Sequence, residues 1–422
     1  MPASPSTARA INDRVALRLL QQEGPLTAGQ LKQLTGLSRP TVADLVERLT
    51  AAGLIEVVGE SGEQRRGPNA RLYGIVADRA HLAALDVRTE GVSVVVSDLL
   101  GRELARASVP IADDTGTGPA VEQAVTLVER AAKEAGAERL HTVGVGAPGL
   151  IDPVTGELRD SSGLPEWHRR LVAALQERLP ARVIVENETN LAALAEQRDG
   201  AARDRDTFVL LWLGHGTGAA VVLDGRLRRG ASGGTGEIGF LPVPGTSTLP
   251  SATDCEGGFH SLAGSAAIVQ LAAGYGSVAT AVSPGEPEAA ALVRQAVATL
   301  SSTSTSTSTS TFPSSSSSSS SSPSPSASSG ADRFLSALAD RLAIGAASVV
   351  AVLDPGCVVL GGEVGQAGGE LLATRVGERL ARMSPLPVEV RASALGGGAV
   401  LRGALLTARE SAQDDLFAPR SR

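Results

Sequence analysis

Residues 36–55 have the sequence GLSRPTVADLVERLTAAGLI. The apolar residues of this stretch recur at the three- and four-residue spacing of one helix face, and they are Val42, Leu45, Val46 and Leu49. Ser38 is the expected N-cap, because its hydroxyl can accept a backbone N–H of the first turn, and Gly53 is the expected stop. The stretch therefore predicts a short amphipathic helix whose N-terminal turn and polar face point to solvent.

The segments on either side complete a winged helix-turn-helix over residues 11–77. Ahead of this helix, Thr27 caps a shorter helix that ends in a glycine turn, and an apolar stripe over residues 11–19 predicts a further helix. After it, residues 54–58 and 71–76 have the pattern of two strands that flank a loop. Two short helices joined by a tight turn and followed by a two-stranded wing are typical of a DNA-binding domain.

The outward-facing residues of the third helix and the basic wing define the predicted DNA contacts. The first turn of a recognition helix can reach base edges, and arginine suits phosphates or a narrow minor groove. The expected DNA-binding residues are Ser38, Arg39, Pro40, Thr41, Arg48, Arg65, Arg66 and Arg71. Residues 1–76 carry nine Lys and Arg against seven Asp and Glu, whereas the remainder carries 29 against 38. The alternative is a three-helix protein-interaction module with a solvated basic hairpin.

Composition limits the class of the whole chain. Of its 422 residues, 42% are hydrophobic and 20% charged, so it can bury a large core divided among about two to four domains. The net charge of −7 argues against a protein whose entire surface binds nucleic acid or an anionic membrane. Cys255 and Cys357 give no disulfide framework. Residues 1–14 lack the apolar core of a signal peptide, and we expect no membrane span and a cytoplasmic protein.

The hydrophobic periodicity of the sequence changes near residue 77, from short helical patterns to the alternation typical of β-strands. We place a domain boundary there. A second landmark is residues 301–330, an almost pure Ser/Thr run. Such a run has too little apolar surface to offset the entropy of ordering it. Apolar helical patterns lie on both sides, so we expect a disordered insert within one domain.

Four segments after residue 140 carry a resemblance to a known family. They are HTVGVGAPGLIDPVTGEL (141–158), VIVENETNLAALAE (183–196), LWLGHGTGAAVVLDGRLRRGASGGTGEIGF (211–240) and LDPGCVVLGGEVGQAGGELL (353–372). In this order they resemble the signatures of the ROK family, which unites bacterial sugar kinases with sugar-responsive repressors on an actin-like ATPase fold. Residues 36–55 and the wing after them resemble the DNA-binding domain of the family's repressors, which its kinases typically lack.

The resemblance implies an α/β fold in which the winged helix-turn-helix precedes a two-lobed actin-like ATPase body of the ROK sugar-kinase type. The expected divisions are an N-terminal tail (1–10), the winged helix (11–77), a small lobe (78–200), a large lobe (201–300 and 331–410), the insert (301–330) and a C-terminal tail (411–422).

The family's catalytic signatures are altered in this chain. Family kinases have an Asp-x-Gly-Gly-Thr loop whose glycines let backbone N–H groups approach nucleotide phosphates, and the matching residues 86–91 lack the paired glycines. A second Gly-rich loop, residues 214–218, remains, although such loops also serve as hairpin turns. The family's general base is an Asp after Asn, but here Glu188 follows Asn187, and the extra methylene moves the carboxylate by more than about an ångström. Glu188 is thus a degenerate base position, and we expect no catalytic residue.

The family's structural zinc is not expected either. Its ligands are the His of Gly-Glu-Ile-Gly-His and three cysteines shortly after, and tetrahedral zinc needs four such ligands. Here Phe240 takes the position of that His, and Cys255 is the one cysteine left in the segment. Asp254 and His260 stand at spacings that match no zinc pattern. We therefore expect no metal and no cofactor, with Phe240 and Phe259 filling the space as apolar packing.

In the family, polar residues of the same motifs hydrogen-bond sugar hydroxyls. Carried over residue by residue, the expected effector-binding set is Asn187, Glu188, Glu237, Phe240 and Ser261. Phe240 stands where the family has His, and Ser261 where it has Glu, so the usual hexose pose should be weakened or changed. Asn187 and Glu237 could equally make turn and strand-end hydrogen bonds within the protein.

Together these features predict a transcriptional regulator, a repressor of carbohydrate-related genes that a sugar or sugar-derivative effector releases. The resemblance implies a homodimer, whose double-stranded operator should be an inverted repeat. Effector binding between the lobes would change their closure and move the paired DNA-binding domains out of register. The alternatives are a ROK-type sugar kinase that uses ATP and a DNA-binding regulator that no longer responds to an effector.

Overall fold

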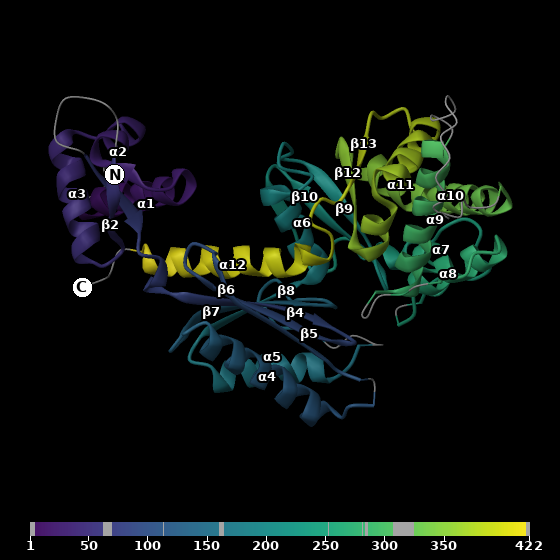
Figure 1. The fold of residues 1–422 in the computed structure, drawn as a ribbon, viewed down its shortest axis with the longest axis horizontal. Coiled ribbons are helices and arrows are strands. Elements are labelled where there is room, and N and C mark those ends of the chain that lie inside the picture. The colour runs from purple at the N-terminus through teal and green to yellow at the C-terminus, as the bar shows by residue number, and fades with distance from the viewer. Residues whose placement is uncertain are drawn as a thin grey trace, which may run out of the picture. The chain divides into compact units, whose positions relative to one another are not determined.

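The residues that the computed structural model describes are 5–61, 70–112, 114–159, 164–251, 253–280, 282, 286–306 and 325–418. The chain divides into two compact units. The first comprises residues 1–145, 166–184 and 404–422, and the second comprises residues 146–165 and 185–403. Each unit is centred on one five-stranded sheet, and the first also holds the small three-stranded sheet of the N-terminal domain (Figure 1).

The N-terminal domain is a winged helix-turn-helix, as predicted. Its elements are α1 (Pro5–Glu23), β1 (Leu26–Thr27), α2 (Ala28–Thr35), α3 (Arg39–Ala51), β2 (Ile55–Ser61) and β3 (Ala70–Ile75). The strands pair antiparallel in the order β1-β3-β2. The expected tail of residues 1–10 is too long, because α1 already begins at Pro5. Proline is well suited to a first helical position and alanine to the turns after it, so the helix precedes its first large apolar residue.

Local hydrogen bonds fix the turn between α2 and α3. Thr27 and Gln30 form a reciprocal capping box, in which the Gln30 N–H donates to Thr27 Oγ1 at 3.2 Å and the Thr27 N–H donates to Gln30 Oε1 at 2.9 Å. Gly36 ends α2 with a φ of +70°, a left-handed conformation that favours glycine. Leu31 and Leu45 are buried at 1% exposure each, so the two helices share an apolar core.

The sheet of the first unit has the strand order β6-β5-β4-β7-β8. Its strands are β4 (His81–Arg88), β5 (Gly91–Asp98), β6 (Glu103–Pro110), β7 (Leu140–Ala147) and β8 (Arg182–Asn187), and a short 3-10 turn, η1 (Ala77–Arg79), precedes them. The first three strands form an antiparallel meander. In Figure 1, helices α4 (Thr117–Glu134) and α5 (Trp167–Arg178) lie along one face of this sheet, and α12 (Ala399–Leu416) lies along the other.

The sheet of the second unit has the order β11-β10-β9-β12-β13, with β9, β12 and β13 parallel and β10 antiparallel to β9. Its strands are β9 (Phe208–Leu213), β10 (Thr217–Leu223), β11 (Arg226–Arg228), β12 (Cys357–Gly361) and β13 (Glu389–Ala392). Its helices are α6 (Glu188–Asp199), α7 (His260–Ala263), α8 (Ser265–Gly274), α9 (Glu288–Ser306), α10 (Pro325–Leu353) and α11 (Gly362–Met383), with 3-10 turns η2 (Ile238–Phe240) and η3 (Gly396–Gly398).

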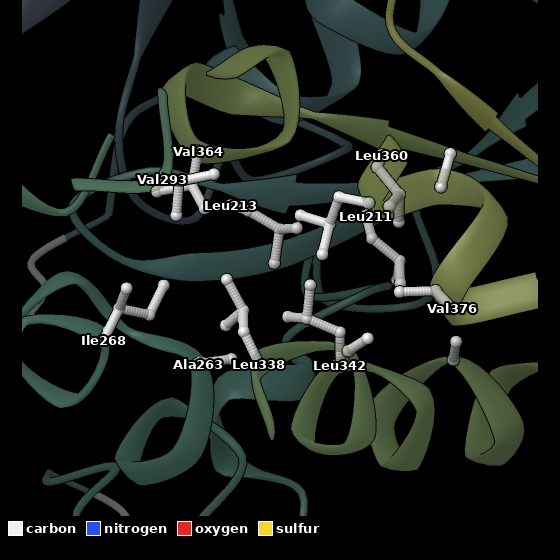
Figure 2. Packing of buried hydrophobic residues seen from close by; sticks show 14 of the residues in the cluster. Leu211, Leu213, Ala263, Ile268, Val293, Leu338, Leu342, Leu360, Val364 and Val376 are labelled. Atoms are coloured by element: carbon white, nitrogen blue, oxygen red, sulfur yellow. The ribbon is translucent and has the colours of Figure 1, made fainter. Parts of the chain in front are cut away.

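The core of the second unit forms where the helices pack on this sheet. Figure 2 shows Leu211 and Leu360 of the strands facing Leu338 and Leu342 of α10, and all four side chains are fully buried. Every residue of β9 is buried, which explains the unbroken apolar sequence of that strand.

Two helices differ from the expected lobe boundaries. We expected residues 78–200 to form one lobe, but α6 belongs to the second unit. We also expected the large lobe to continue to residue 410 and a tail to follow, but residues 404–422 return to the first unit and α12 continues to Leu416. The backbone of Ala404 lies directly against Gly144 of β7, where any larger side chain would collide with it. Helical periodicity predicts an apolar face but does not tell which sheet that face covers.

The helices around the Ser/Thr-rich insert are longer than predicted. We expected disorder over residues 301–330, whereas α9 continues to Ser306 and α10 begins at Pro325. The hydroxyls of Ser301 and Ser302 donate to the carbonyls of the preceding turn, at 3.0 and 2.9 Å, so both have acceptors within α9. The rest of the predicted insert, residues 307–324, lies outside the described residues.

One helical segment in the described part of the chain, Ser328–Leu353 of α10, is long and apolar enough to cross a membrane by length and composition. Its apolar face is instead used in the core, where Phe334, Leu335 and Leu338 are fully buried. We therefore describe α10 as the central core helix of the second unit.

Candidate DNA-binding surface and effector site

The first turn of α3 presents an exposed polar surface. Ser38 is its N-cap, and its Oγ accepts the Thr41 N–H at 3.3 Å and lies 2.7 Å from Thr41 Oγ1. Arg39 and Pro40 occupy the first helical positions and are exposed. No described residue forms an ion pair with Arg39. This arrangement leaves the guanidinium available to a ligand outside the chain.

Arg48 has a structural role that the sequence did not reveal. Its side chain is partly buried, its Nη2 lies 2.6 Å from Asp13 Oδ1 of α1, and it also pairs with Asp44 one turn back. Hydrogen bonding to Asp13 raises the pKa of this guanidinium. Arg48 thus joins α1 to α3, and the contact with DNA that we predicted for it would have to compete with Asp13 and Asp44. The periodicity placed it on the polar face of α3, but only the packing of α1 shows that a carboxylate meets it there.

The wing contributes one described basic residue. Arg71 is exposed on β3 and lies opposite Glu60 of β2 in the antiparallel register. Arg65 and Arg66, which we also predicted as DNA contacts, lie outside the described residues.

Asn187 serves as the N-cap of α6. Its Oδ1 accepts the N–H groups of Thr189 and Asn190 at 2.9 and 3.3 Å, and its Nδ2 donates to Gly149 O at 3.1 Å and to Glu188 Oε2 at 2.9 Å. Both ends of the amide are therefore already hydrogen-bonded within the protein. These contacts favour the turn-stabilising interpretation of Asn187 over direct effector contact.

Glu186 is a residue of this region that the sequence analysis missed. It is 5% exposed, and its Oε1 accepts the Asn187 N–H at 3.0 Å and Asn190 Nδ2 at 2.9 Å. Its Oε2 accepts Arg229 Nε at 2.6 Å. Glu186 thereby ties the start of α6 to the loop after β11, which leads to Glu237. A signal existed, because a charged residue that directly follows the apolar run 183–185 needs a partner when it is buried.

Glu237 differs from Asn187 in its surroundings. No described residue forms a hydrogen bond or ion pair with its carboxylate. The side chain keeps an exposed surface, yet the protein around it removes enough water to raise the pKa of this carboxyl. Glu237 is therefore the member of the predicted effector set that is best placed to accept hydrogen bonds from a ligand.

Phe259 and Phe240, which lie in the segments that match the family's zinc motif, differ in burial. Phe259 is fully buried and lies against Gly345 of α10, where a side chain at position 345 would collide with the ring. Phe240, three residues after Glu237, is 39% exposed. Our expectation that both phenylalanines fill the space as packing is therefore wrong for Phe240, whose 3-10 turn holds the ring at the surface.

Three further polar residues stand in the segment that matches the family's zinc motif, and they are Cys255, His260 and Ser261. Ser261 Oγ accepts the Gly257 N–H at 2.8 Å, so this predicted effector contact closes a turn. Burial raises the pKa of the Cys255 thiol, which opposes the thiolate form that zinc requires. Burial, aided by His215, lowers the pKa of His260. Among the described residues, no group of three His, Cys, Asp or Glu side chains is arranged to hold a metal ion.

The stretch that corresponds to the family's phosphate loop is a tight hairpin between β4 and β5. Arg88 pairs with Gly91 in the antiparallel register, which leaves a two-residue turn. Asp86 is 4% exposed, and its Oδ2 lies 3.0 Å from Arg88 Nε. A Cβ at Gly91 would lie 2.6 Å from Val109 O, so β6 packs closely against this turn.

A winged helix-turn-helix joined to an actin-like body of two five-stranded sheets defines the class of protein, and comparison with known families agrees with it. The ROK family model matches residues 82–411, so the chain belongs to the ROK family. A MarR family model matches residues 14–67, which lie within the winged helix.

Curated relatives include two regulators. The "DNA-binding transcriptional dual regulator NagC" of Escherichia coli (strain K12) is 28% identical over 243 residues, which cover 56% of this chain and 58% of NagC. The "Xylose repressor" of Bacillus subtilis (strain 168) is 23% identical over 251 residues, which cover 57% of this chain and 62% of that protein. The chain thus spans less than two thirds of the length of these relatives in the matched regions.

Solved structures show the same fold. The "ROK family transcriptional regulator, homolog of E.coli MLC protein" superposes with a TM-score of 0.72 at 20% identity, covering 97% of this chain and 98% of that one. A ROK family glucokinase from Streptomyces griseus, solved with glucose and AMPPNP, superposes with a TM-score of 0.59 at 23% identity, covering 78% of this chain and all of that one. The structural similarity to the regulator therefore extends over nearly the whole chain.

Proposed function

We propose that this chain is a DNA-binding transcriptional regulator, a repressor of carbohydrate-related genes that a small-molecule effector releases from its operator. The observation that carries the proposal is the exposed first turn of α3, where Arg39 is not engaged by any described residue, in a chain whose body belongs to the ROK family. The names of the relatives, NagC and xylose repressor, support the same role. Such a regulator would act in the cytoplasm.

The proposed DNA contacts fall into two groups. Ser38, Arg39, Pro40 and Thr41 would enter the major groove at the start of α3, where Arg39 can donate two hydrogen bonds to a guanine. Arg71, together with Arg65 and Arg66 of the wing, would contact phosphates. A homodimer with two such domains would bind an inverted repeat whose half-sites are about 34–36 Å apart, or a multiple of that distance.

The proposed effector is a sugar or a sugar derivative, and Glu237 is its main protein contact. A carboxylate can accept hydrogen bonds from two hydroxyls, and the exposed Phe240 ring nearby offers apolar surface to the C–H face of a sugar ring. Glu188 would contribute a second carboxylate from the first turn of α6. The effector would release DNA only to the extent that it binds the released state more tightly than the DNA-bound state.

We further propose that the chain is not an enzyme. The stretch that would cradle nucleotide phosphates is a hairpin turn whose Asp86 is paired with Arg88, and Glu188 replaces the aspartate of the family's general base. Phosphotransfer depends on positioning a nucleotide and a base with little tolerance, so both changes oppose it.

The test is fluorescence anisotropy of the purified full chain with labelled duplex from its own upstream region. A scrambled duplex of equal length at the same salt concentration is the control. Preferential binding of the upstream duplex supports the proposal and allows a screen of sugars for release. Equal weak binding to both duplexes, together with ATP turnover in the presence of a hexose, would replace it with the kinase alternative.

A second candidate is a regulator that binds its operator without any effector. The specific observation in its favour is that two of the five predicted effector contacts, Asn187 and Ser261, are engaged in turns. This candidate predicts preferential operator binding that no sugar changes, whereas the effector-responsive regulator predicts that Glu237→Ala abolishes release by the active sugar without changing operator affinity.

A further inference from the structure

Glu188 and Glu237, the two carboxylates of the proposed effector site, are placed around one short segment after β7. The side-chain amide of the α6 cap donates to Gly149 O at 3.1 Å and to Glu188 Oε2 at 2.9 Å. On the next residue of that segment, Leu150 Cδ2 would lie 3.6 Å from a Cβ added at Gly234, and Glu237 Cγ would lie 3.7 Å from the same Cβ. Both carboxylates therefore border the same part of the second unit.

The segments that carry these residues contain no lysine or arginine. Residues 140–158, 183–197 and 207–225 have none, and neither has the long run of residues 230–293. The acidic residues of that long run are Glu237, Asp254, Glu256, Glu286 and Glu288. Proteins hold phosphate groups with arginine, lysine or the open N–H groups of a helix start. These segments thus bring negative charge to the site and no guanidinium or ammonium group.

Three described cations that border these segments are already engaged. Arg229 Nε lies 2.6 Å from Glu186 Oε2, and Arg159 Nη2 lies 2.6 Å from Asp152 Oδ2. Arg341 of α10 donates to one backbone carbonyl of α7 and one of α8, at 3.2 Å each. Each guanidinium would have to give up acceptors within the protein before it could bind a phosphate.

The helix start and the histidine of this region do not replace the missing cations. The N–H groups of Thr189 and Asn190 already donate to Asn187 Oδ1, at 2.9 and 3.3 Å, and Glu188 adds a negative charge to the same turn. Burial lowers the pKa of His260, so its ring is uncharged at neutral pH.

The surroundings of Glu237 strengthen the effect of its charge. The protein around this side chain removes water, which raises the pKa of the carboxyl and also weakens the screening of its charge. A phosphate ester would place about two further negative charges beside this carboxylate. Sugar hydroxyls, in contrast, donate hydrogen bonds that a carboxylate accepts.

We propose that the effector carries no phosphate group, so that the site binds an uncharged sugar and rejects the phosphate ester of the same sugar because Glu188 and Glu237 repel it. This inference rests on the proposed function, in which these carboxylates contact the effector. It narrows the effector from sugars and their derivatives in general to the unphosphorylated class.

The experiment compares matched ligands on the full chain by isothermal titration calorimetry at neutral pH and fixed salt. The probes are N-acetylglucosamine, xylose and glucose, together with the phosphate esters of the same three sugars; the first two occur in the names of relatives. We expect at least one free sugar to bind at least about tenfold more tightly than its ester, because like charges brought together disfavour binding. The same sugar should release labelled operator duplex in the anisotropy assay.

A variant pair tests the cause of this preference. Glu237→Gln keeps the shape and removes the charge, so the ratio of the two affinities should shrink by roughly threefold or more. Glu288→Gln is the matched control, because Glu288 is exposed at the start of α9 and loses the same charge. Its ratio should equal that of the wild type. Thermal unfolding of each variant shows that it is folded.

Three results would overturn the proposal. An ester that binds as tightly as its free sugar would mean that the site holds a cation for the phosphate. An unchanged ratio in folded Glu237→Gln would mean that this carboxylate does not cause the preference. Binding of none of the six probes would mean that the site takes no sugar. In that last case the anisotropy assay still separates the two proposals, since a regulator without an effector keeps its preference for the operator.

Discussion

The N-termini of α3 and α6 are both capped by a side-chain oxygen, but the residues around the two caps differ in burial and in hydrogen bonding. Ser38 is the N-cap of α3 and Asn187 is the N-cap of α6, and the side chain of each accepts backbone N–H donation from the turn that follows. After Ser38 come exposed residues, whereas Glu186, Thr189 and Asn190 around the second cap are buried and hydrogen-bonded. The first start therefore offers its polar groups to another molecule, and the second uses them to hold the protein together.

The comparison teaches that a polar motif does not by itself reveal its role. Asn187 and Arg39 were both predicted ligand contacts because their residue types suit that chemistry. The structure gives Asn187 four hydrogen bonds within the protein, while Arg39 pairs with none of the described residues. The number of partners that a side chain already has separates the two cases.

The largest expected effect is on the buried start of α6. Glu186→Ala leaves the buried Asn190 amide without its acceptor, while the half-exposed Arg229 can turn to solvent, and we expect the second unit to lose about 2–3 kcal/mol of unfolding free energy. The measurement is urea unfolding followed by Trp212 fluorescence in a Trp167→Phe background, since the chain has two tryptophans and Trp212 lies in β9. Arg39→Ala should change this free energy by less than about 0.5 kcal/mol. If both substitutions reduced the unfolding free energy equally, the start of α6 would contribute no more to stability than the start of α3.

The first turn of α5 holds a buried histidine, His168, which should make the stability of the protein depend on pH. His168 is 1% exposed there, and burial lowers its pKa to about 4, because the nearby Arg88 backbone and Glu90 only partly oppose the loss of water. The unfolded chain binds this proton near pH 6.5 and the folded chain only near pH 4. Stability should therefore be constant above pH 6.5 and fall by up to about 3 kcal/mol as the pH drops toward 4.

The check on His168 is urea unfolding between pH 4 and 7, followed by Trp167, whose ring centroid lies 4.3 Å from that of His168, in a Trp212→Phe background. His168→Leu should remove this part of the pH dependence. If wild type and variant lose stability in parallel as the pH falls, His168 is not the group that titrates.

Arg39, at the exposed start of α3, should affect DNA binding and not folding. Arg39→Ala should reduce the preference for the operator over a scrambled duplex by about 1–3 kcal/mol, while Arg71→Ala should weaken all duplexes about equally and lower the salt slope by about one. Anisotropy titrations at several salt concentrations measure both quantities. The same loss of preference in both variants would refute the assignment of Arg39 to bases and Arg71 to phosphates.

The smallest expected effect is that of the exposed cap itself. Ser38→Ala removes one capping hydrogen bond and should destabilise the winged helix by about 1 kcal/mol. We expect a modest loss of affinity for every duplex, without change in preference, in the same anisotropy assay. A specific loss of operator preference would instead mean that the Ser38 hydroxyl contacts a base.

Much of the fold follows from local patterns in the sequence. The helix from Arg39 to Ala51, its cap and its buried face agree with the spacing of Val42 to Leu49. The winged helix and the ROK body agree with the motifs because cap residues, glycine turns and apolar alternation act over a few neighbouring residues. The boundaries were less well predicted, since α6 and α12 each pack with a different unit from the one expected.

The candidate site was predicted only in part, and for a consistent reason. Arg48, Ser261 and Asn187 all have partners within the protein that residue type alone does not reveal. Glu186 was overlooked because its importance arises from a residue more than 40 positions away, Arg229.

The sequence by itself determined the class of this protein, its secondary structure near caps and glycines, and the absence of the family's zinc ligands and catalytic aspartate. Only the tertiary structure decided which polar groups remain open to another molecule. The physical reason is that buried polar and charged groups must be paired, and the partner comes from whichever distant segment the packing brings beside them. Arg39 remains open to a ligand because none of the described residues pairs with it, whereas Glu186 is paired with Arg229 from a distant segment.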